Sequence, residues 1–114
     1  LIRACRDEHI RLLSLPAKER TGRLAFKVDA AFHEAIAACA NNPFFEADVV
    51  QHNRLRQLFE YRDAPNAERV VVWLKEHLDI MDALVGGSPN EASDLMRMHL
   101  TNARRNRKRL MPRK

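Results

Sequence analysis

The sequence contains little of what a β-sheet or a disulfide-stabilised fold needs. Among its 114 residues only three are glycine and 6% are aromatic. Clusters of valine, isoleucine and threonine that alternate with polar residues are missing, and this absence argues against strands. The two cysteines, Cys5 and Cys39, form no CxxC pair, so we expect reduced thiols and no disulfide framework. These absences together predict an all-α protein.

A long apolar run is also missing. No segment approaches the roughly 18 apolar residues that a membrane-spanning helix needs, and no signal peptide opens the chain. We therefore expect a cytoplasmic protein without a membrane partner. The chain begins at Leu1, without a methionine and inside what reads as a helix, so we expect a fragment that lacks an N-terminal part.

The apolar content of 46% suits a single domain with a buried core. The net charge is +5, and seven basic residues fall between Arg104 and Lys114, where no acidic residue occurs. Such a run fits either a nucleic-acid patch or a solvated helix end whose cations complement the helix dipole. We favour the helix end because no aromatic side chain interleaves the run to stack on bases.

Proline, asparagine and glycine divide the chain into helical segments. The break at Asn42-Pro43 follows from the avoidance of helical geometry before proline, and Gly86-Gly87 is a strong C-terminal signal. Pro89 suits the first position of the last helix. The expected helices span residues 7–13, 17–40, 43–62, 67–85 and 89–110, with a turn at 63–66.

Histidine interrupts the apolar face of three of these helices. Each of the three positions belongs to a stripe with the spacing i, i+3, i+4, i+7, which marks the buried face of an amphipathic helix. The stripe residues are Val70, Trp73, Leu74, Ile80, Met81 and Leu84 around His77; Ala92, Leu95, Met96 and Ala103 around His99; and Phe26, Ala30, Ile36, Ala37 and Ala40 around His33.

A carboxylate accompanies one of these histidines. Asp29 lies four residues before His33, so both side chains project from one helix face. Burying a polar group without a partner costs about 2–7 kcal/mol, and an unpaired carboxylate costs more. A divalent metal would satisfy Asp29, His33, His77 and His99 together. A core histidine bonded to a carbonyl or water and a simple helix pair of Asp29 with His33 are the alternatives, and the pattern alone leaves both possibilities open.

Ordered segments around these residues resemble the FCD domain, the C-terminal effector domain of the FadR subfamily of GntR-type transcription regulators. The resemblance extends from about Arg6 to Arg109. One departure is Gly-Gly-Ser-Pro-Asn in place of the usual Gly-Asp before the last helix. The matching segments are Asp29-Ala-Ala-Phe-His33, Ala40-Asn-Asn-Pro43, Glu76-His77 with Ile80 and Ala83-Leu84, and Met96-Arg-Met-His99-Leu100.

The resemblance implies an antiparallel helical bundle around a central metal and ligand cavity, spanning residues 1–114. It implies a divalent metal on Asp29, His33, His77 and His99, most readily zinc, although nickel, manganese or iron can be accommodated. It further implies a small carboxylate effector, a homodimer, and DNA binding only through a winged helix-turn-helix that we expect to be missing from this chain. The resulting expectation is a sensor and not an enzyme.

Three further side chains are candidates for holding the effector. Arg54 and Arg56 could each grip a carboxylate with two hydrogen bonds, although solvated surface arginines are the simpler interpretation. His52 shares a predicted stripe with Phe45, Val49, Leu55 and Phe59, and a satisfied core histidine is an equal alternative.

Two other classes of function remain open at this point. A metal-dependent hydrolase-like enzyme could use an open metal position to activate water, but it needs a general base that is not a ligand. Glu34 and Glu76 each neighbour a predicted ligand and are expected to point away from the ligand face. A metal-free helical interaction module is the second alternative.

Overall fold

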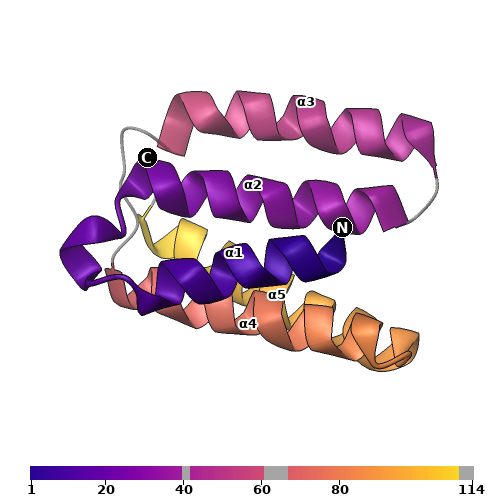
Figure 1. The fold of residues 1–114 in the computed structure, drawn as a ribbon. Coiled ribbons are helices and arrows are strands. Elements are labelled where there is room, and N and C mark those ends of the chain that lie inside the picture. Colours follow the sequence, from indigo (N-terminus) through magenta and orange to yellow (C-terminus); the bar gives the residue numbers. More distant parts are fainter. Residues whose placement is uncertain (40–41, 61–66, 111–114) are drawn as a thin grey trace. The chain divides into compact units, whose positions relative to one another are not determined.

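A computed structural model describes the backbone of residues 1–39, 42–60 and 67–110, and the side chains of residues 1–39, 42–57 and 68–102. All secondary structure in these residues is helical, which confirms the predicted all-α class (Figure 1). The predicted turn at 63–66 and the side chains of the basic run from Arg104 lie outside the described residues. The elements are α1 (Ile2–Ser14), the 3-10 turn η1 (Ala17–Glu19), α2 (Gly22–Cys39), α3 (Pro43–Glu60), α4 (Ala67–Val85) and α5 (Pro89–Leu110).

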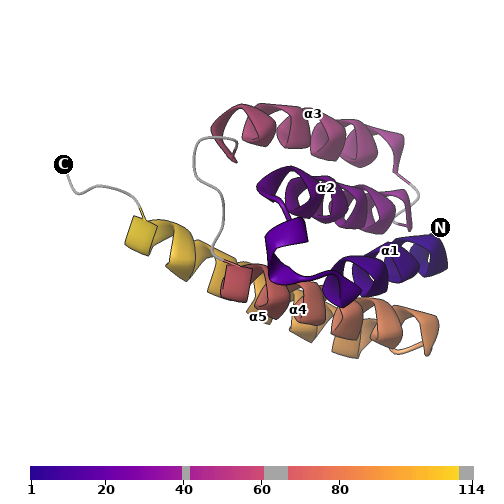
Figure 2. The ribbon, with the colours of Figure 1, turned by 60° about the vertical axis from the view of Figure 1, so that its left-hand side comes forward.

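The chain divides into two compact units, Leu1–Leu74 and Lys75–Lys114, with the boundary inside α4. In the first unit α1, α2 and α3 are antiparallel neighbours, and α2 lies in the middle (Figures 1 and 2). Because α2 is covered on two sides, apolar and small side chains are buried around much of it. The apolar core of this unit consists of Leu12, Ala25, Val28, Val70 and Leu74, with Leu13, Leu15 and Trp73 packed against it.

The first helix is longer than predicted, and the second is shorter. A start at Asp7 is wrong because α1 already begins at Ile2, and the buried Cys5 belongs to its inner face. A helix from Ala17 is also wrong, because α2 begins at Gly22. The Thr21 hydroxyl accepts a hydrogen bond from the Leu24 amide at 3.2 Å and so caps this start.

The α4–α5 connection in the second unit follows the prediction closely. Gly87 has a φ of 76°, a left-handed conformation that glycine adopts without strain. The Gly87 amide donates to the Leu84 carbonyl at 3.2 Å and the Ser88 amide to the Ala83 carbonyl at 2.9 Å. This pair of bonds is the Schellman pattern, which ends α4 so that Pro89 can start α5.

Burial confirms most of the predicted inner face of α4. Val70, Leu74, His77, Ile80 and Met81 are each at most 2% exposed. None of the helices among the described residues combines the length and the hydropathy needed to cross a bilayer.

Candidate metal centre

The Asp29 carboxylate in the first unit is buried and contacts the side chains of His33 and Arg56. Its Oδ1 lies 3.3 Å from His33 Nε2, one turn further along α2. Its Oδ2 accepts a hydrogen bond from Arg56 Nη2 on α3 at 2.8 Å. Because the carboxylate retains only 12% of its exposure, these contacts replace water as its main stabilising partners.

Arg56 is held in place by more than its ion pair. Its Nη2 also donates to Asn53 Oδ1 at 2.9 Å, and its guanidinium carbon lies 5.4 Å from the centroid of the Phe26 ring. A guanidinium over an aromatic face is attracted by the ring's negative π surface. The structure therefore places this predicted effector residue directly on Asp29.

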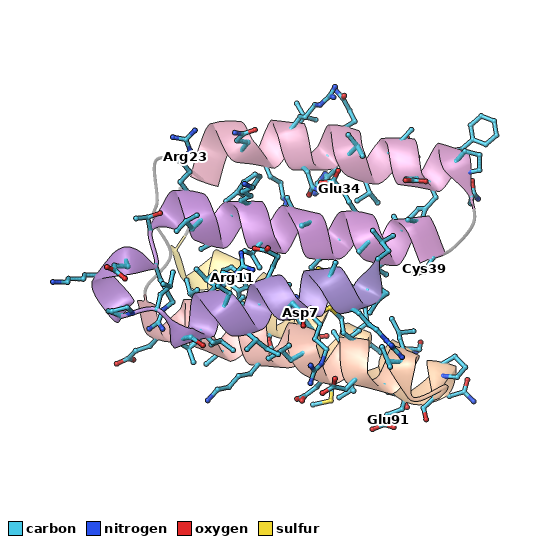
Figure 3. The ribbon with its side chains drawn as sticks, viewed as in Figure 1. Asp7, Arg11, Arg23, Glu34, Cys39 and Glu91 are labelled. Atoms are coloured by element: carbon cyan, nitrogen blue, oxygen red, sulfur yellow. The ribbon has the colours of Figure 1, made fainter. Side chains whose placement is uncertain are left out.

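Asn53 is a buried polar residue that the sequence interpretation missed. It is 5% exposed, and its Nδ2 donates to the Ala30 carbonyl at 3.3 Å and to Glu34 Oε2 at 3.2 Å. Figure 3 shows Glu34 on the side of α2 that faces α3. The asparagine thus ties α3 to α2 beside Asp29. The spacing of Val49, Asn53 and Arg56, four and then three residues, could have identified this inner face.

The predicted apolar stripe of α3 is wrong at three positions, whereas Val49 is half-buried and the side chain of Phe59 lies outside the described residues. Phe45 and Leu55 are 47% and 50% exposed, and His52 is exposed as well. The reason is that α3 is an outer helix of the first unit, so it buries only a narrow strip on α2. Arg54 is also exposed on α3. An effector role for His52 and Arg54 stays a prediction.

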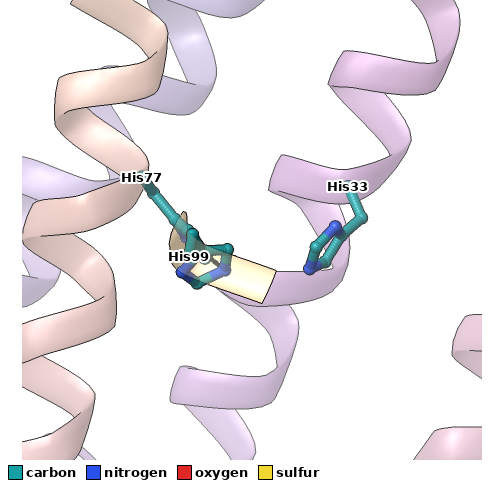
Figure 4. Close-up of side chains that lie close together, drawn as sticks. All are labelled: His33, His77 and His99. Carbon is teal, nitrogen blue, oxygen red and sulfur yellow. Dashed lines mark hydrogen bonds between the residues drawn. The ribbon is translucent and has the colours of Figure 1, made fainter. Parts of the chain in front are cut away.

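His77 on α4 and His99 on α5 face each other in the second unit (Figure 4). They are 0% and 4% exposed, and their Nε2 atoms lie 3.0 Å apart. The ring planes meet at 77°, with centroids separated by 4.5 Å. Both imidazoles therefore occupy interior positions, as their places in the two stripes predicted.

The prediction that Glu76 points away from the ligand face is wrong, because its carboxylate contacts His99. Its Oε1 lies 2.9 Å from His99 Nδ1, and its Oε2 accepts a hydrogen bond from Asn102 Nδ2 at 2.7 Å. Its long side chain can reach across to α5, although its backbone position lies beside the buried stripe of α4. The carboxylate is 23% exposed, so it is a partly buried partner of His99.

His9 on α1 is a second buried residue that the sequence interpretation missed. Its ring is fully buried, packs edge-on against Phe32 at 5.9 Å, and places Nδ1 2.8 Å from the Cys5 carbonyl. Burial lowers the pKa of His9, while the Cys5 carbonyl and the Asp29 carboxylate act in the opposite direction. The spacing of Cys5, His9 and Leu12 carries the signal, but a helix that starts at Asp7 hides it.

The donor chemistry of these residues fits a divalent metal. In the second unit His77 and His99 can each offer one ligand nitrogen (Figure 4), and in the first unit His33 offers an imidazole nitrogen of the same kind. Neutral imidazole nitrogens are preferred ligands of zinc and of several other divalent ions. Asp29, the fourth predicted ligand, lies beside His33 in the first unit.

A known protein family matches this chain. The family model of the FCD domain matches residues 2–102, which is most of the chain. Neither a curated protein nor a solved structure matches the sequence. The FCD domain is the ligand-binding domain of GntR-family regulators. This chain belongs to the FCD domain family.

Proposed function

We propose that this chain is the ligand-sensing domain of a bacterial transcription regulator and that it holds one divalent metal ion. The observation that carries the proposal is the pair of buried imidazoles, His77 and His99, whose Nε2 atoms lie 3.0 Å apart. Two ring nitrogens that face each other in the interior form half of a ligand set. The family membership supports a sensing role for such a site.

In this proposal His33 and Asp29 complete the ligand set from α2. They already share one helix face, with Oδ1 of Asp29 3.3 Å from His33 Nε2. Asp29 would contribute negative charge, and the histidines would contribute neutral nitrogen lone pairs. Zinc suits this set best, and nickel, manganese or iron can also be accommodated. When bound, the ion supplies a positive centre to which an effector can coordinate.

We further propose a small carboxylate as the effector and Arg56 as the residue that binds its other end. The Arg56 guanidinium is adjacent to Asp29 and can donate two parallel hydrogen bonds to a carboxylate. His52 and Arg54 are proposed as further contacts from α3. An effector of this kind acts on the helices only through its different affinity for two arrangements of them.

The proposed setting is a cytoplasmic homodimer that binds DNA through a separate winged helix-turn-helix domain. This part of the proposal comes from the resemblance to regulators that contain FCD domains. Sedimentation analysis tests the dimer directly: a species of twice the chain mass is expected at high micromolar concentration, and a monomer alone would contradict it.

Metal analysis of the purified protein tests the central claim. We expect about one zinc or similar ion per chain, and a loss of thermal stability when a chelator removes it. Because a ligand that binds only the folded state stabilises it, zinc at 100 times its dissociation constant should add about 2.7 kcal/mol to the free energy of unfolding. Metal far below one ion per chain, with no effect of chelator or added zinc, would contradict the proposal. Chelator-sensitive turnover of ester or phosphoester substrates would favour the hydrolase instead.

A further inference from the structure

We propose that Glu76 is a positioning residue, which orients the His99 ring and fixes its tautomer for metal binding. We also propose that a hydrogen bond from Asn102 keeps the Glu76 carboxylate in place. The inference rests on the proposed metal site but concerns a residue outside the ligand set. All the side chains that carry it belong to the second unit, on α4 and α5.

The first step is the tautomer of His99. An ionised carboxylate can only accept hydrogen bonds, so the contact of 2.9 Å between Glu76 Oε1 and His99 Nδ1 requires the proton to be on Nδ1. In a neutral imidazole the other nitrogen, Nε2, then carries the lone pair. His99 is therefore already in the form in which Nε2 can bind a cation.

The second step concerns His77. Its Nε2 lies 3.0 Å from His99 Nε2, and a hydrogen bond between the two nitrogens needs one donor and one acceptor. With both rings neutral and His99 Nε2 as the acceptor, His77 Nε2 is the donor, so the two rings hold opposite tautomers. His77 has to move its proton to Nδ1 before its Nε2 can serve as a ligand, whereas His99 does not.

The third step is the support of Glu76 itself. Asn102 lies three residues after His99, on the same side of α5, and its Nδ2 donates to Glu76 Oε2 at 2.7 Å. Each carboxylate oxygen consequently has a partner on α5. Because Glu76 is 23% exposed, Asn102 restricts a side chain that otherwise has room to turn toward water.

A partner of this kind has a measurable effect on metal binding. Hydrogen-bond acceptors on the second nitrogen of a metal-binding histidine fix its tautomer and raise its basicity, and their loss weakens metal affinity about 10–100-fold. A residue that only fastened α4 to α5 would instead lower the stability of the metal-free protein and leave the affinity unchanged. The two roles therefore differ in what they predict.

The test combines zinc affinity, measured by competition with a chelator, with ¹⁵N NMR of the histidine rings in the metal-free protein. Glu76→Ala should weaken zinc binding by about 10–100-fold. Glu76→Gln should retain much of the affinity because its amide oxygen can still accept from His99 Nδ1. Glu91→Ala, which removes an exposed glutamate from α5, is the matched control and should bind zinc as the wild type does. In the wild type the NMR spectra should show the proton on Nδ1 of His99 and on Nε2 of His77.

Wild-type affinity for zinc in Glu76→Ala would overturn the inference, and so would a proton on Nε2 of His99 in the wild type. The NMR measurement needs no variant, so it decides the tautomer even where Glu76→Ala does not fold. Failure of the wild type to bind any metal would refute the proposed function instead. In that case the tautomers still show whether Glu76 orients His99.

Discussion

Replacing His77 with alanine is expected to abolish tight metal binding and to destabilise the metal-free protein as well. The affinity should fall by more than about 100-fold, because losing a residue that merely orients a ligand already costs about 10–100-fold. The His77 side chain is 0% exposed, and its Nε2 lies 3.0 Å from His99 Nε2. Its removal therefore leaves the buried Nε2 of His99 without this hydrogen-bond partner. The free energy of unfolding in the presence of chelator should therefore fall by about 1–3 kcal/mol. Calorimetric metal titration and denaturant unfolding measure the two effects.

Gln51→Ala is the control for that experiment. It removes a polar side chain from an exposed position on α3 that belongs to no proposed site, so the free energy of unfolding should change by no more than about 0.5 kcal/mol. Its metal affinity should stay at the wild-type value. If His77→Ala retained both the affinity and the stability of the wild type, His77 would be neither a ligand nor a structural partner of His99.

Asp29→Ala is expected to have the second-largest effect, and this effect appears even without metal. The substitution leaves the Arg56 guanidinium, which is 15% exposed, without its carboxylate. Removing one member of a buried ion pair costs about 3–5 kcal/mol, and the partial exposure of this pair places the expected loss near 3 kcal/mol. Urea unfolding in the presence of chelator measures this loss, and the same variant should bind zinc more weakly.

A double-mutant cycle separates the ion pair from other effects at Asp29. Because the two residues are in contact, Asp29→Ala combined with Arg56→Ala should cost less than the sum of the single substitutions. Asp48→Ala removes an exposed carboxylate from α3 and should be close to neutral. Additive single effects would show that the 2.8 Å contact contributes little to folding.

The helical architecture and the inward histidines of α4 and α5 could be predicted from the sequence because they depend on local periodicity. His77 and His99 lie where the stripe spacing requires an inner residue, and the structure buries both. The end of α4 was equally predictable, since the left-handed residue after a helix is usually glycine.

The partners of Asp29 could not be predicted in the same way. Arg56 lies 27 residues further along the chain, and its contact depends on how α3 packs on α2. Asn53 was missed because an inner asparagine has the same hydrophobicity as a surface one. Its spacing from Val49 and Arg56 marks the inner face, and its hydrogen bonds with Ala30 and Glu34 fix its place there. The error at the start of α1 had a different cause. The predicted helix 7–13 begins at an acidic residue, which is typical of a first turn, although the preceding residues also belong to the helix.

The two cysteine thiols differ in chemical accessibility. Burial raises the pKa of the Cys5 thiol to about 11, whereas Cys39 is exposed near the end of α2. Since the thiolate is the reactive form, an alkylating reagent applied to the folded chain attacks Cys39 and spares Cys5. A dye can therefore be attached at one known place without mutagenesis. The rate at which Cys5 is then labelled measures how often α1 separates from the helices that bury it.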